Sequence, residues 1–160
     1  MTPAERRDLI TRYANGPELL RAALAEVPEA AMQWRPAPGK WSVHEVIIHC
    51  ADSESNAHGR IRTLVAEPDP KILGYDQDLW AKVFDYHSRP LGPALVTIEA
   101  VRANTVPILE SLTEKDWKKM GTHTESGPYG AEDWLKSYGT HLEVHAAQIR
   151  RNVTGWKGRT

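Results

Sequence analysis

The chain has 160 residues and a mass of 18.0 kDa, which suits a single domain spanning residues 1–160. Lys and Arg total 20 against 21 Asp and Glu, so the charge balance argues against a nucleic-acid-binding domain, which normally carries a basic excess. No apolar run approaches the roughly 20 residues that cross a bilayer, and the single cysteine, Cys50, excludes an internal disulfide, so we expect a cytoplasmic protein without a membrane or nucleic-acid partner.

The first predicted helix begins at Thr2-Pro3-Ala4-Glu5, where a capping threonine, an early proline and an acid three residues after the cap form a helix start. An apolar stripe continues this helix to Val27. Within Asn15-Gly16-Pro17, the proline lacks an amide donor and disfavours helical geometry before it. We therefore expect a kink or break at this step, followed by a proline-rich connector over residues 28–41.

The second helix is predicted from Ser42 to about Glu67, because Ser42 and Glu45 have the capping-box spacing. Residues 68–90 are the least regular part of the chain, and a short helix is expected at 76–80.

A third helix is predicted from about Gly92 to Leu112, with a bend at Pro107. Residues 113–116 predict a short capped turn, and residues 121–130 a polar loop. The fourth helix is predicted from Ala131 to Asn152. No strand pattern of comparable strength occurs.

Four amphipathic helices predict an all-α four-helix bundle. The link between the second and third helices is about 23 residues, whereas helix–helix connections typically have about 2–8 residues. Such a link can return along the whole bundle, so the second and third helices are expected to run parallel in an up-down-down-up arrangement.

Histidines occupy the inward stripes of two predicted helices. In the fourth helix, positions on one face at about 100° per residue are Trp134, Tyr138, His141, His145 and Ile149. His141 and His145 are one turn apart, so both rings can point at one ion. His49 lies in the most apolar part of the second helix. The pattern favours a metal site at His49, His141 and His145, because three buried imidazoles without partners would each cost a few kcal/mol.

The alternative is that each histidine is a core side chain satisfied by a carbonyl or carboxylate group. If a metal is present, three protein nitrogens leave at least one coordination position open, as in catalytic sites, where water or a thiolate is activated. Asp52, three residues after His49, is a candidate base or orienting group. Tyr138 is a candidate donor to substrate, although it could simply fill core volume. Glu45 is already explained by capping.

The mouth of such a site would be formed by the long crossover and by the polar loop. Candidates are Tyr75, Asp76, Trp80, His123 and Tyr129, for which surface packing is the alternative role. Trp41 and Trp134 lie beside the histidine-bearing segments and are expected to anchor the core.

The stretch from Arg35 to Val46, followed by His49-Cys50-Ala51-Asp52, resembles the DinB-like (DinB/YfiT) superfamily, whose members often have W-S-x-x-E-x-x-x-H-x-x-D here. Asp133-Trp134-Leu135 with His141-x-x-x-His145 resembles the last helix of that family. The resemblance covers essentially the whole chain and implies an up-down-down-up bundle with a divalent metal held by His49, His141 and His145. Cys50 replaces the leucine that is common in the family.

The function that the resemblance implies is mixed. Some members resemble metal-dependent hydrolases, whereas others transfer low-molecular-weight thiols to electrophiles. We therefore expect a metal-dependent enzyme in which zinc, nickel or iron activates water or a low-molecular-weight thiol for attack on a small electrophilic substrate. The alternative is a non-catalytic metal-binding or stress-response module with a structural or vestigial metal. A homodimer through an outer helix face is suggested by analogy alone.

Overall fold

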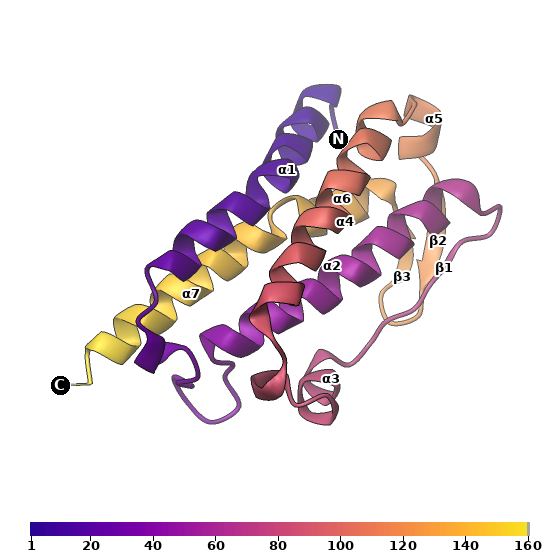
Figure 1. Cartoon of the computed structure of the whole chain (residues 1–160). Coiled ribbons are helices and arrows are strands. Elements are labelled where there is room, and N and C mark those ends of the chain that lie inside the picture. The colour runs from indigo at the N-terminus through magenta and orange to yellow at the C-terminus, as the bar shows by residue number, and fades with distance from the viewer. Residues whose placement is uncertain (160) are drawn as a thin grey trace.

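Residues 1–159 are described by a computed structural model in which long helices lie along one another (Figure 1). The long helices are α1 (Pro3–Ala25), α2 (Val43–Ala66), α4 (Leu91–Ser111) and the consecutive α6 (Ala131–Gly139) and α7 (His141–Lys157). In Figure 1, α1 descends from the N-terminus, α2 and α4 both ascend, and α7 descends again. The four-helix bundle with parallel α2 and α4 confirms the predicted up-down-down-up topology.

Short elements complete the connections. Two 3-10 turns span Glu29–Ala31 and Tyr86–Ser88, and two short helices are α3 (Gln77–Val83) and α5 (Glu114–Trp117). The expected short helix in the crossover is confirmed by α3, which Asp76 caps through bonds from the amides of Asp78 and Leu79. Within the part of the chain that the structure describes, no helix is both long and apolar enough to span a membrane.

Of the predicted kink or break at Pro17, the break does not occur, since α1 runs unbroken through this residue. A proline in a helix leaves the carbonyl four residues earlier without its amide donor. Here that carbonyl belongs to Tyr13, and it accepts a hydrogen bond from Nη1 of Arg102 on α4. The side chain of another helix therefore replaces the missing backbone donor.

Gly16 makes room for this contact. A Cβ at Gly16 would lie 2.5 Å from Nη1 of Arg102 and 3.0 Å from Cβ of Leu142. We expect Gly16→Ala to lower the free energy of unfolding by about 1–3 kcal/mol, because Arg102 is buried and cannot retreat freely. Urea denaturation measures this. Gly59→Ala is the control: it lies on an exposed part of α2 with no atom within 4 Å of a new Cβ, and should be neutral or stabilising. Equal effects of the two changes would contradict the steric explanation.

The fourth predicted helix is divided at Thr140, which has non-helical dihedrals (φ −111°, ψ 1°). α7 also extends past Asn152 to Lys157. Close packing accompanies the break, since a Cβ at Gly139 would lie 3.0 Å from Cδ2 of Leu9 on α1. Arg102, which donates to the carbonyl of Tyr13, also donates through Nη2 to the carbonyl of Tyr138 at 3.2 Å.

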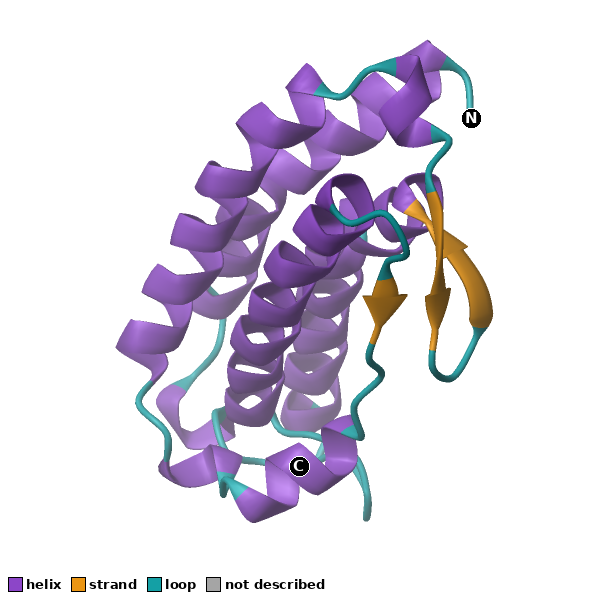
Figure 2. Ribbon diagram, turned by 90° about the vertical axis from the view of Figure 1, so that its right-hand side faces the viewer, coloured by secondary structure: helices purple, strands orange, loops and turns teal. Residues whose placement is uncertain are grey.

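The expected polar loop at 121–130 is wrong, because it forms a hairpin. β2 (Met120–His123) pairs antiparallel with β3 (Gly127–Gly130), and β1 (Lys71–Ile72) from the crossover pairs parallel with β2. Figure 2 shows the three strands along one flank of the helices. The strands are glycine-rich and lack apolar alternation, so they carry no sequence signal for β structure. Gly121 is required where the backbone of β2 approaches that of Pro70, because a Cβ at this position would lie 2.4 Å from the carbonyl oxygen of Pro70.

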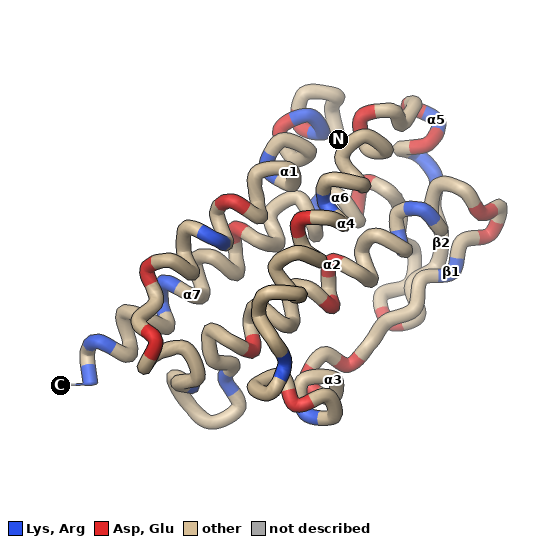
Figure 3. The backbone as a smooth tube through the Cα atoms, in the orientation of Figure 1, with Lys and Arg blue, Asp and Glu red and all other residues tan. Residues whose placement is uncertain are grey.

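The buried interior consists of two hydrophobic clusters separated by a polar layer. One cluster includes Leu20, Ile47, Ile98, Leu142 and Ile149, and the other includes Ile10, Ile61, Leu109, Trp134 and Leu135. Between them on α2 and α4 lie Glu54 and Arg102, both fully buried. Figure 3 shows basic and acidic residues interspersed over the elements, in keeping with the formal net charge of −1.

Candidate metal centre

His49 from α2 and His141 and His145 from α7 converge in the bundle interior. Each offers one ring nitrogen to a group in which all these atoms lie within 4.8 Å of one another. Nε2 of His141 lies 3.2 Å from Nε2 of His145. Nitrogens held at about 2.0–2.1 Å from a shared zinc ion require separations of this order. The structure therefore brings together the three residues predicted as ligands.

The local structure explains how these rings meet. His141 is the first residue of α7, directly after the break at Thr140, and His145 follows one turn later on the same face. His49 lies in the apolar part of α2, where it is only 4% exposed, and its ring packs 4.6 Å from the Trp41 ring. The two helices thus present imidazoles to each other across the bundle.

Burial sets the protonation state of two of these rings. Burial, with the neighbouring His145 and His141, lowers the pKa of His49 to about 3. Burial and His141 lower the pKa of His145 to about 4. Both rings are therefore neutral at pH 7, which is the form that donates a lone pair to a metal.

The cluster fits a divalent cation better than it fits three ordinary core histidines. Nδ1 of His49 is buried and has no hydrogen-bond partner among residues 1–159. A core histidine would be satisfied by a carbonyl or carboxylate group, and an imidazole left without such partners is costly. Imidazole donor sets suit zinc, nickel and ferrous iron.

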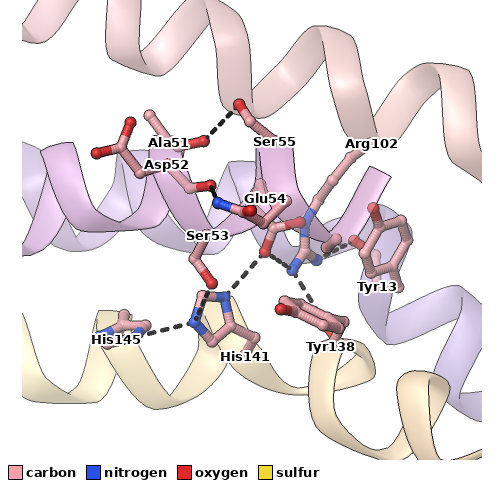
Figure 4. Close-up of polar contacts among 12 residues, drawn as sticks. Tyr13, Ala51, Asp52, Ser53, Glu54, Ser55, Arg102, Tyr138, His141 and His145 are labelled. Atoms are coloured by element: carbon pink, nitrogen blue, oxygen red, sulfur yellow. Dashed lines mark hydrogen bonds and ion pairs between the residues drawn. The ribbon is translucent and has the colours of Figure 1, made fainter. Parts of the chain in front are cut away.

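Outer contacts orient the two rings of α7, and Figure 4 shows the contact between His141 and Glu54. Nδ1 of His141 donates to Oε1 of Glu54 at 2.9 Å, and Nδ1 of His145 donates to Oε1 of Gln148 at 2.9 Å. Both contacts leave Nε2 as the free, lone-pair-bearing atom of the ring. Acceptors of this kind fix the tautomer and raise the basicity of a ligand histidine.

Glu54 is itself held by a buried ion pair. Arg102 binds it through two parallel contacts, Nη2 to Oε1 at 2.6 Å and Nε to Oε2 at 3.0 Å. Burial alone would raise the pKa of Glu54, but Arg102 and His141 outweigh it and hold that pKa below its usual value. Glu54 is thus a carboxylate that accepts from His141. Neither residue was predicted from the sequence, although Arg102 lies one turn after Ile98 on the inward stripe of α4, which was an available signal.

The structure does not bring Asp52 to the histidines. Its Oδ2 accepts a hydrogen bond of 2.5 Å from the hydroxyl of Tyr86, and it lines a separate cavity of about 630 Å³ beside Trp80 and Phe84. In Figure 4, Asp52 points away from His141. The reason is helical geometry: Ser53 and Glu54 lie on the side of α2 that, like His49, faces α7, whereas Asp52 faces the crossover. Glu54 makes the orienting contact that was expected of Asp52.

Tyr138 lies where it was expected. Its ring centroid is 5.5 Å from that of His141, and its hydroxyl accepts from Nη1 of Arg60 at 3.1 Å. Burial raises the pKa of Tyr138, so the phenol stays protonated at neutral pH. It also packs within a hydrophobic cluster, so it fills core volume as well as facing the site.

A cavity of about 660 Å³ opens onto the three histidines. Its wall includes Trp41, Arg60, Tyr75, His123, Tyr129 and Gln148. Three of the mouth residues predicted from the sequence, Tyr75, His123 and Tyr129, are therefore in the wall. Asp76 and Trp80 are not: Asp76 caps α3, and the Trp80 ring packs 4.5 Å from that of Tyr75.

The contact of Gln148 yields a prediction about metal affinity. Gln148→Ala should weaken zinc binding by roughly 10–100-fold, because His145 loses the acceptor that fixes its tautomer. Gln148→Glu should retain tight binding, since a carboxylate oxygen can accept the same hydrogen bond. Competition with a chelating dye measures both affinities. An alanine variant that binds zinc as tightly as the unaltered protein would show that the contact is dispensable.

Comparisons with known proteins agree with this geometry. Residues 12–149 match a protein family described as the DinB superfamily. A protein from Bacillus licheniformis is 33% identical over 164 residues, covering 96% of this chain and 90% of that protein. One from Oceanobacillus iheyensis is 31% identical over 133 residues, covering 83% of this chain and 77% of its own. Both carry the description "Putative metal-dependent hydrolase".

The same fold occurs among solved structures. YfiT from Bacillus subtilis superposes with a TM-score of 0.90 at 22% sequence identity, covering 98% of this chain and 90% of its own. It is described as "a probable metal-dependent hydrolase with an unusual four-helix bundle topology". At this level of identity the superposition establishes the shared fold.

Proposed function

This chain belongs to the DinB superfamily, and we propose that it is a metal-dependent enzyme that activates water, as a hydrolase does, or a low-molecular-weight thiol for attack on a small electrophilic substrate. The observation that carries the proposal is the convergence of His49, His141 and His145 at the base of an open cavity. Three protein ligands leave coordination positions open, which is typical of catalytic rather than structural zinc sites. The descriptions of the Bacillus licheniformis and Oceanobacillus iheyensis proteins support the same reaction class.

A divalent cation held by the three imidazoles supplies Lewis acidity, which lowers the pKa of water or of a low-molecular-weight thiol and polarises a substrate oxygen. The residues of this chain supply the rest. Glu54 and Gln148 hold the rings of His141 and His145 in one tautomer. Tyr138 presents a protonated phenol beside His141, from which it can donate to a developing negative charge.

Water and thiol are separate branches of this proposal, and product analysis distinguishes them. Protein loaded with zinc, nickel or ferrous iron should cleave at least one member of a panel of small esters, amides and phosphoesters, and a chelator should abolish the cleavage. Adding a low-molecular-weight thiol should leave products unchanged if water is the nucleophile, and should give a thiol adduct if the thiol attacks. A panel that reacts at equal rates with and without metal would contradict both branches.

The main alternative is a module in which the metal has a structural role. One observation favours it: the cluster connects α7 through Glu54 to Arg102 on α4, so a cation here would link three helices. Thermal melting after chelation separates the two roles. An intact fold with lost activity supports catalysis, whereas loss of cooperative folding on chelation supports the structural role.

A further inference from the structure

We propose that the substrate carries a negatively charged group, a carboxylate or phosphate, and that Arg60 binds this group in the cavity above the histidines. This inference rests on the proposed function, because it names the substrate class of the same site. Three observations support the inference: the charge of Arg60 is not paired with a carboxylate, its side chain lines the cavity, and other hydrogen-bond donors surround it.

A single residue, Tyr138, connects Arg60 to the candidate metal centre. Its Nη1 donates to the hydroxyl of Tyr138 at 3.1 Å, and the Tyr138 ring lies 5.5 Å from that of His141. Its Nη2 donates to the carbonyl oxygen of Leu73 at 2.5 Å, and its guanidinium lies 5.8 Å from the centre of the Tyr75 ring. The guanidinium and the three histidines therefore line the same cavity.

The charge of Arg60 is not neutralised by the protein. Within residues 1–159, its two hydrogen bonds go to a phenol and a carbonyl group, and no carboxylate forms an ion pair with it. Six other arginines are paired with carboxylates, and the remaining arginines of residues 1–159 that form no ion pair do not line this cavity; the paired ones are Arg6, Arg12, Arg21, Arg35, Arg102 and Arg150. A guanidinium has five N–H donors in a fork that matches the oxygens of carboxylate and phosphate groups. Two contacts leave donors available for a ligand.

The surrounding wall favours an anion. Lys40 also lines the cavity, and Asp78 is the carboxylate among the described lining residues, so the charged wall residues carry a positive excess before any cation binds. Burial raises the pKa of Tyr75 to about 12 and that of Tyr129 to about 12, so their hydroxyls remain donors at neutral pH.

The small sheet fixes the position of Arg60. Leu73 directly follows β1, and β1 is held to β2 by bonds from the amides of Thr122 and Thr124 to the carbonyls of Pro70 and Ile72. The carbonyl that restrains Arg60 is thus anchored by the hairpin. This arrangement gives a preorganised charge, which loses little conformational freedom when an anion binds.

The test uses two short-chain hydroxamates, one ending in a carboxylate and the other in the matching neutral carboxamide. Both carry the same metal-binding group, so calorimetric titration of zinc-loaded protein compares only the far end. We expect the carboxylate probe to bind about tenfold more tightly. Arg60→Gln should abolish this preference, and Arg60→Lys should restore part of it because the charge returns without the fork.

Arg62→Gln is the matched control. Arg62 lies one half-turn away on the same helix, where it contacts the carbonyl of His58 and the side chain of Thr105 outside the cavity. This variant removes the same charge and should keep the tenfold preference. Equal affinity for the two probes in the unaltered protein, or an undiminished preference in Arg60→Gln, would overturn the inference.

A metal-free measurement separates this inference from the proposed function. If zinc strengthens the binding of neither hydroxamate, the metal-dependent function fails. Metal-free protein at pH 8 then decides the role of Arg60, because benzoate should bind more tightly than neutral benzamide. That difference should vanish in Arg60→Gln and persist in Arg62→Gln, and any other pattern contradicts the inference.

Discussion

Replacing both His141 and His145 by alanine is expected to reduce bound zinc from about one equivalent to less than about one-tenth, with complete loss of metal-dependent hydrolysis. Two of the three imidazoles that converge at the site are then missing, and His49 alone cannot hold the ion. Elemental analysis of protein purified without a histidine tag measures the metal content. Circular dichroism should show that the helices remain, because both positions border a cavity.

His123→Ala provides the matched control for this experiment. His123 lines the same cavity from β2 but is not one of the three clustered histidines. It should therefore keep its full equivalent of zinc. If the double variant binds as much zinc as His123→Ala, the three histidines do not form the metal centre, and the proposed metal-dependent function is contradicted.

Arg102→Met is expected to lower the free energy of unfolding by about 3–5 kcal/mol, the largest stability effect that the structure predicts. The change leaves Glu54 buried without its cation, and it also removes the donor to the carbonyl of Tyr13 that Pro17 leaves unpaired. Urea denaturation of the metal-free protein measures the loss. Metal affinity should fall as well, because Glu54 orients His141.

Two further variants test the explanation. Arg21→Met removes an arginine from the exposed pair with Glu99, and should leave the denaturation curve close to that of the unaltered protein. Glu54→Gln combined with Arg102→Met should recover part of the lost stability, because no uncompensated charge is then buried. If Arg102→Met and Arg21→Met cost the same, the buried ion pair does not have the role assigned to it.

Much of the site followed from spacing along individual helices. His141 and His145 share a face because they are one turn apart, and His49 is buried because its neighbours on α2 are apolar. Because these are local properties, the three histidines could be predicted as ligands from the sequence. In the structure their ring nitrogens lie close together. The position of Asp52 was not predicted correctly. Its separation of three residues from His49 also allows it to face the crossover and Tyr86.

The contacts that orient the ligands lay outside the reach of such patterns. Glu54 accepts from His141 across 87 positions of the sequence, and Arg102 binds Glu54 across 48. The hairpin was missed for a related reason: β1, which lies in the crossover, pairs with β2 from beyond α4, and the glycines and polar residues of β2 and β3 show no alternation.

The Gly16-Pro17 step illustrates the difference between features that depend on local sequence and features that depend on tertiary contacts. Four amphipathic helices, the capped starts of α1 and α2, and the faces on which the three histidines lie could be predicted from the amino-acid sequence, because they depend on periodicity and on side chains a few positions apart. Packing between distant elements explains why α1 continues past Pro17, why Glu54 rather than Asp52 orients a histidine, and why Arg60 lines the cavity. Each of these outcomes depends on a partner from a distant element, since a buried polar group takes whatever donor or acceptor the packed helices place beside it.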